Sequence, residues 1–156
     1  MDTFTVTFFG HRDFCEHSKY EEKLEKIIRF VLSSHTYVNF LIGRNGEFDT
    51  FATSVIKRML KEREDDFSTC LTLVLPYPTA EYKNSAEYFE EYYDSIEICH
   101  SSRTSHFKSA ITIRNYEMID RSDLVIFYSK ESSGGTASAL KYAEKQNKQV
   151  INLCLC

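Results

Sequence analysis

Hydroxyl and glycine residues gather in one short run, E-S-S-G-G-T-A, at positions 131–137. The run comes just before a helical pattern and contains Ser132, Ser133, Gly134, Gly135 and Thr136. Backbone N–H groups at the start of a helix lack an acceptor inside the helix, and the helix dipole is positive there. The run is therefore a candidate phosphate site. An ordinary N-cap loop has the same composition, so that interpretation stays open beside it.

A second candidate segment is F-F-G-H-R, at positions 8–12, where Gly10, His11 and Arg12 follow a run of β-branched and aromatic residues. An arginine directly after a strand can make a bidentate pair with a phosphate or a carboxylate. The alternative for Arg12 is a surface ion pair. Its role depends on whether the fold brings it near the run at 131–137.

The third candidate segment is I-G-R-N-G-E-F-D, at positions 42–49, which holds Gly43, Arg44, Asn45, Gly46, Glu47 and Asp49. Arg44 could contact a phosphate, and Glu47 or Asp49 could bind ribose hydroxyls. Asp49 could equally stabilise the dipole of the helix that follows. Neither the G-x-G-x-x-G pattern nor the P-loop pattern is present, and no cofactor is predicted.

Strand and helix patterns alternate along the whole sequence. We predict strands at 3–9, 38–42, 70–75, 95–99, 123–128 and 149–153, and helices at 19–32, 47–63, 84–93, 107–121 and 134–146. This order predicts an α/β fold, a Rossmann-like three-layer sandwich with a mostly parallel sheet, formed by one domain over residues 1–156. In such sheets ligands bind outside the carboxyl ends of the strands. The three segments should converge there, and Arg114 and Asn115 of the helix at 107–121 could reach the same opening.

The composition limits the classes of partner. The 156 residues are 42% hydrophobic and 27% charged, with a net charge of -4, which argues against a nucleic-acid partner held by bulk electrostatics. There is no apolar run of membrane-spanning length, and the five cysteines form no CxxC pair. We therefore expect a cytoplasmic protein with free thiols. No metal site is predicted, because Cys99, His100 and His106 lack a second pair at zinc spacing.

The motifs in this order resemble the SLOG superfamily, which includes the Smf/DprA and Lonely Guy groups, and are most similar to its small YpsA-like bacterial branch. The resemblance rests on F-F-G-H-R, G-R-N-G-E-F-D, the run from Arg114 to Phe127 and the run from Ser132 to Ala143. It implies a Rossmann-like fold whose glycine-containing loops hold a nucleotide or a nucleotide-derived signal. It also allows for a homo-oligomer.

The expected function is binding of a small phosphorylated nucleotide-like ligand, as a sensor or sequestering module. The alternative is a hydrolase of the Lonely Guy type that cleaves an N-glycosidic bond, with Glu47, Asp49 and Glu131 as candidate catalytic carboxylates. That family's motif carries a catalytic Glu where this sequence has Ala139. The tyrosine-rich segment from Tyr88 to Tyr93 is open to two interpretations, a lid over the pocket or a subunit interface.

Overall fold

A computed structural model describes residues 2–63, 68–102 and 105–155 of the chain. The strands are β1 (Thr3–Gly10), β2 (Tyr37–Ile42), β3 (Thr69–Leu75), β4 (Ser95–Ile98), β5 (Leu124–Tyr128) and β6 (Gln149–Asn152). The helices are α1 (His17–Ser34), α2 (Glu47–Lys61), α3 (Ala80–Asn84), α4 (Ala86–Tyr92), α5 (Phe107–Arg121) and α6 (Gly135–Lys145), followed by the 3-10 turn η1 (Leu153–Leu155).

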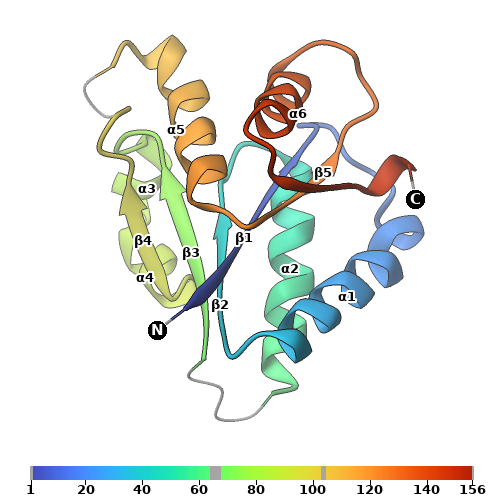
Figure 1. Ribbon diagram of the computed structural model, residues 1–156. Coiled ribbons are helices and arrows are strands. Elements are labelled where there is room, and N and C mark those ends of the chain that lie inside the picture. The colour runs from blue at the N-terminus through green and yellow to red at the C-terminus, as the bar shows by residue number, and fades with distance from the viewer. Residues whose placement is uncertain (1, 64–67, 103–104, 156) are drawn as a thin grey trace.

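The six strands form one sheet in the order β4-β3-β2-β1-β5-β6, and every described pairing is parallel (Figure 1). Successive strands from β1 to β4 extend the sheet in one direction, and β5 and β6 extend it in the other. The order therefore reverses between β1 and β5. Loops after two strands that flank such a reversal separate from each other and leave a crevice at their carboxyl ends.

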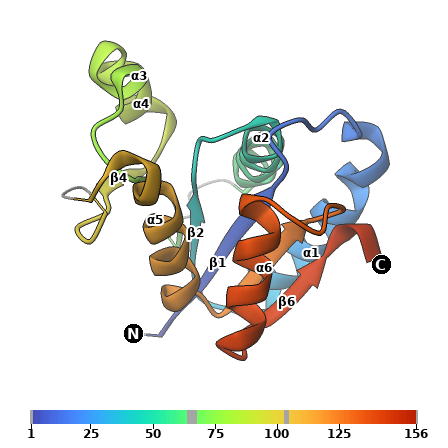
Figure 2. The ribbon, with the colours of Figure 1, turned by 90° about the horizontal axis from the view of Figure 1, so that it is seen from above.

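Helices cover both faces of the sheet, as the view from above shows (Figure 2). One core lies between the sheet and α1, α2 and α4, and contains Phe8, Phe40, Leu24, Ile56 and Phe89. The other lies between the sheet and α5 and α6, and contains Leu41, Val125, Phe127, Met118 and Ala139. Neighbouring strand residues such as Phe40 and Leu41 belong to opposite cores, because successive strand side chains point to opposite faces. The predicted Rossmann-like three-layer fold is confirmed.

A reciprocal pair of hydrogen bonds fixes β5 beside β1. The backbone N–H of Thr5 donates to Oδ2 of Asp123 at 2.8 Å, and the backbone N–H of Asp123 donates to the carbonyl oxygen of Thr5 at 2.8 Å. From this point the two strands run in register to Gly10 opposite Tyr128. Both strands therefore end at the same level, and their loops emerge next to each other.

The element boundaries differ from the predicted ones mainly between β3 and β4. The single helix expected at 84–93 is replaced by α3 and α4, with Ser85 between them at φ -136°. No helix of the described residues is long and apolar enough to cross a membrane. Cys15, Cys70, Cys99 and Cys154 are free thiols, and Cys156 lies outside the described residues.

Candidate functional site

A cavity of about 260 Å³ lies at the carboxyl ends of the strands, where the order of the sheet reverses. Its lining comes from all three segments and from α5: Phe9, Gly10, His11, Arg12, Asn45, Asp49, Ile111, Asn115, Ser133, Gly134, Gly135 and Thr136. Phe9 and Ile111 were not predicted and supply an apolar wall. Ile111 could have been found from sequence, because it stands four residues before Asn115 and so lies on the same face of α5.

The N-terminus of α6 opens into this cavity. The N–H of Ser138 donates to the carbonyl oxygen of Gly134 at 3.0 Å at the start of the helix. No side chain of the described residues forms a capping hydrogen bond there. The earlier N–H groups, together with the hydroxyls of Ser133 and Thr136, are therefore donors at the positive end of a helix dipole. Gly134 has φ +99°, a conformation that favours glycine. Ser132, also predicted, is exposed and does not line the cavity.

The loop after β1 is attached to both neighbouring loops. Nε2 of His11 accepts the backbone N–H of Lys130 at 2.8 Å, which joins this loop to the one after β5. The carbonyl oxygen of Arg12 accepts the N–H of Glu47 at 2.8 Å, which joins it to the start of α2. The Arg12 side chain is exposed at the cavity rim, and no other described residue forms a hydrogen bond or an ion pair with its guanidinium. Arg12 is therefore a cation available to a bound anion.

Three of the five glycines stand where a Cβ would crowd neighbouring atoms of the protein, although Gly10 also lines the cavity. A Cβ on Gly10 would stand 2.1 Å from the ring of Phe48, and one on Gly46 would stand 2.5 Å from Cα of Arg12. A Cβ on Gly43 would come within 3.2 Å of the Arg114 guanidinium. Neither Gly43 nor Gly46 lines the cavity. In contrast, a Cβ on Gly135 would meet nothing within 4 Å.

Arg44 does not line the cavity. Its Nε donates to Glu81 at 2.7 Å and its Nη1 donates to the Tyr93 hydroxyl at 3.1 Å, while its guanidinium lies 4.8 Å from the centre of the Phe89 ring. These contacts direct the side chain toward α3 and α4. The tyrosine-rich segment is thus fixed to the loop after β2 through Arg44, beside the position of Asn45 in the cavity.

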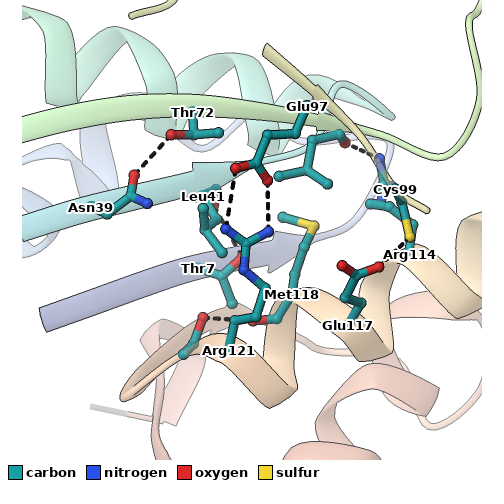
Figure 3. A network of polar contacts seen from close by, with 12 residues as sticks. Thr7, Asn39, Leu41, Thr72, Glu97, Cys99, Arg114, Glu117, Met118 and Arg121 are labelled. Atoms are coloured by element: carbon teal, nitrogen blue, oxygen red, sulfur yellow. Dashed lines mark hydrogen bonds and ion pairs between the residues drawn. The ribbon is translucent and has the colours of Figure 1, made fainter. Parts of the chain in front are cut away.

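Arg114 lies beneath the site and is only 1% exposed. Its Nη1 donates to the carbonyl oxygen of Val74 at 2.8 Å, and its Nε donates to Oδ1 of Asn115 at 3.0 Å. Figure 3 shows Arg114 beside Cys99 and Glu117. Burial lowers the pKa of Arg114, and the charge of Asp49 opposes that shift. Arg114 therefore cannot reach a ligand with its side chain, but it orients the Asn115 amide and places a positive charge behind the cavity.

Asp49 is buried in the first turn of α2, with 8% of its surface exposed, and lines the cavity. Desolvation raises the pKa of Asp49 to about 6, against the lowering effects of the hydrogen bond from the Asn45 backbone N–H at 2.9 Å and of the Arg114 charge. The hydrogen bond from Asn45 and the charge of Arg114 therefore only partly offset the free-energy cost of removing the Asp49 carboxylate from water.

The raised pKa of Asp49 predicts a specific pH dependence of folding. A group whose pKa is higher in the folded than in the unfolded protein stabilises the fold when the pH is below the unfolded-state pKa. That stabilisation is lost as the pH rises through the folded-state pKa. The free energy of unfolding of wild type minus that of Asp49→Asn should therefore fall by about 2–3 kcal/mol between pH 4 and pH 7.5. Urea denaturation of both proteins at the two pH values measures it, and an unchanged difference would contradict it.

Two of the three candidate catalytic carboxylates lie outside the cavity lining. Oε2 of Glu47 accepts the backbone N–H of Phe14 at 3.2 Å and so faces the loop after β1. Glu131 is exposed and does not line the cavity. Asp49 alone among the three lines it. Among the described residues no group of three or more His, Cys, Asp and Glu side chains is arranged to hold a metal ion.

Comparison with known proteins identifies fold neighbours only. No protein-family model matches the sequence, and no curated protein matches it significantly. Among solved structures, DNA processing protein A from Helicobacter pylori, described in a single-stranded DNA binding mode, superposes with a TM-score of 0.63 at 16% identity. DNA processing protein A (DprA) from Streptococcus pneumoniae superposes with a TM-score of 0.62 at 13% identity.

Both structural neighbours are Smf/DprA proteins, a group of the SLOG superfamily that the motifs resemble. The alignments cover 94% of this chain in each case, but only 63% of the Helicobacter protein and 49% of the Streptococcus protein. At such low identity the likeness shows a shared fold. The neighbours do not support a more specific placement in the YpsA-like branch.

These neighbours correct two expectations from the sequence. A small phosphorylated nucleotide as ligand, with the N-glycosidic hydrolase as the alternative, is wrong, because the fold is shared with a protein that binds single-stranded DNA. The argument against nucleic acid is wrong for the same reason. That argument used the net charge of the whole chain, which describes long-range attraction. A phosphate is bound by the donors next to it, and those of the cavity include an arginine without an acidic partner among the described residues.

Proposed function

We propose that this chain binds single-stranded DNA and that the cavity between the loops after β1 and β5 holds one phosphate of the strand. The observation that carries the proposal is that the α6 N-terminus and the Arg12 side chain meet in one cavity, neither of them with a side-chain partner among the described residues. Backbone N–H groups and an arginine are the groups with which proteins hold DNA phosphates. The shared fold of the Helicobacter single-stranded DNA-binding protein supports it.

The size of the cavity favours a segment of a chain over an enclosed small molecule. Pockets that enclose drug-sized ligands measure about 300–1,000 Å³, and this cavity measures about 260 Å³. It accommodates a phosphate with part of its sugar, while the rest of a strand continues over the surface. Phe9 and Ile111 provide an apolar wall against which the sugar can pack.

The negative net charge sets the expected strength of binding. At a net charge of -4 the protein gains little from long-range attraction to DNA. We expect weak binding that depends on one or two phosphate contacts. Each contact to a single strand contributes a slope of about -0.7 to the dependence of log K on log salt.

We also propose that the protein is related to the YpsA-like branch of the superfamily, because its sequence motifs resemble that branch. We propose a cytoplasmic location, because the described cysteines are free thiols.

Replacing Arg12 by alanine is expected to weaken binding of a fluorescein-labelled oligo(dT) about tenfold and to reduce the salt slope by about 0.7, because one phosphate contact is lost. Fluorescence anisotropy at several salt concentrations measures both quantities. Gly135→Glu is expected to weaken binding more strongly, since the added carboxylate enters open space at the helix N-terminus and repels a phosphate there.

The matched control is Arg44→Ala, which removes the same charge from the neighbouring loop. Because Arg44 is held by Glu81 and Tyr93, this variant should bind oligo(dT) like wild type. Equal affinities of wild type and Arg12→Ala, or an equal loss in both arginine variants, would place the DNA elsewhere on the protein. Circular dichroism of each variant verifies that the fold is retained.

A further inference from the structure

Among the described residues that line the cavity, Asp49 is the one acidic side chain, and the other polar side chains can all donate hydrogen bonds. These donors are His11, Arg12, Asn45, Asn115, Ser133 and Thr136, with the backbone N–H groups at the start of α6. A carboxylate at this position repels the phosphate that the donors attract. The arrangement thus opposes anion binding whenever Asp49 is ionised.

The groups around Asp49 compensate its charge only in part. One oxygen accepts the Asn45 backbone N–H, and the charged group that acts on it from α5 is Arg114. No ion pair within 4 Å joins Asp49 to any other described residue. From the loop after β1, His11 and Arg12 line the cavity, and His11 is bound to the backbone of the next loop. Glu47, on the same helix, is bound to the Phe14 N–H.

We propose that binding of a DNA phosphate in this cavity is coupled to uptake of a proton by Asp49, an inference that rests on the proposed function. A phosphate adds a negative charge beside a carboxylate that is already desolvated. The neutral acid removes that repulsion, and its O–H becomes a further donor to the phosphate. The complex therefore favours the protonated form more strongly than the free protein does.

The sign of the pH dependence follows from this coupling. In the free protein the pKa of Asp49 is already raised to about 6 by burial, and a bound phosphate raises it further. Affinity is then highest below pH 6 and falls as the pH rises toward the pKa of the complex. Uptake of one proton changes the affinity by at most about tenfold per pH unit.

The test is binding of labelled oligo(dT) from pH 5.5 to pH 8.0 at constant ionic strength, since neither thymine nor the phosphodiester titrates in this range. Wild-type affinity should fall about tenfold between pH 6 and pH 8. Asp49→Asn should show no such fall and should bind about tenfold more tightly than wild type at pH 8. Glu47→Gln removes a carboxylate two residues away, outside the cavity, and should keep the wild-type profile.

His11 is the other titratable group of the cavity that needs a control. Gln can supply an acceptor near the position of Nε2, so His11→Gln separates titration of the ring from its contact with Lys130. This variant should keep the fall in affinity with pH. Loss of the fall in His11→Gln, or its persistence in Asp49→Asn, would overturn the assignment to Asp49.

A measurement on the wild-type protein alone makes the test independent of any variant's folding. Calorimetric titration with oligo(dT) at pH 7 in two buffers of different ionisation enthalpy gives the number of protons taken up, which should be about one half, as a tenfold fall in affinity over two pH units requires. Binding without proton uptake overturns the coupling and leaves the proposed function intact. Absence of binding at every pH overturns the proposed function and this inference with it.

Discussion

Replacement of Arg114 by leucine is expected to lower the free energy of unfolding by about 3–5 kcal/mol, which is a large part of the stability of an ordinary domain. The guanidinium is 1% exposed and donates to the Val74 carbonyl oxygen and to Asn115. Leucine leaves that carbonyl without its donor and leaves the buried Asp49 carboxylate without the positive charge that acts on it. Urea denaturation at pH 7.5 measures the loss.

A second arginine of α5 provides the control for Arg114→Leu. Arg121 forms an ion pair with Glu97 at 2.6 Å on the surface, as Figure 3 shows. Exposed pairs contribute about 0–1 kcal/mol, so Arg121→Leu should have little effect. Adding Asp49→Asn to Arg114→Leu should restore part of the lost stability at pH 7.5, because the uncompensated charge is removed. Equal losses in the two arginine variants would contradict the buried role of Arg114.

Replacement of Gly10 by alanine is expected to lower the free energy of unfolding by about 3 kcal/mol, at the upper end of the usual cost of overpacking. The added Cβ would stand 2.1 Å from the ring of Phe48. Phe48 is fully buried and packs against Phe14, Phe51 and Tyr128, so the ring has no free space to enter. Thermal and urea denaturation measure the change.

Gly135→Ala is the matched control for Gly10→Ala, since it makes the same change in the same cavity lining. Its Cβ would meet nothing within 4 Å, and alanine favours a helix over glycine by up to about 1 kcal/mol. This variant should be as stable as wild type or more stable. Comparable destabilisation by both variants would contradict the assignment of Gly10 to packing and of Gly135 to an open helix end.

The order of strands and helices was predictable from sequence because each element carries its own periodicity. The continuous apolar runs of β3 and β5 are typical of strands covered on both faces, and α5 begins and ends at the predicted residues. The meeting of the three loops also followed, since the carboxyl ends of parallel strands share one edge of the sheet. The division into α3 and α4 was missed, because it depends on the backbone at one residue, Ser85.

Local periodicity specifies the elements, their alternation and the edge of the sheet where the donors gather. The role of each candidate side chain at that edge depends instead on its contacts in the folded protein. Arg12, Arg44 and Arg114 are alike as residue types, yet one is free at the cavity rim, one is bound to Glu81 and Tyr93, and one is buried under Gly43. The reason is physical: a charged side chain is positioned by partners distant in sequence, and local periodicity carries no information about them.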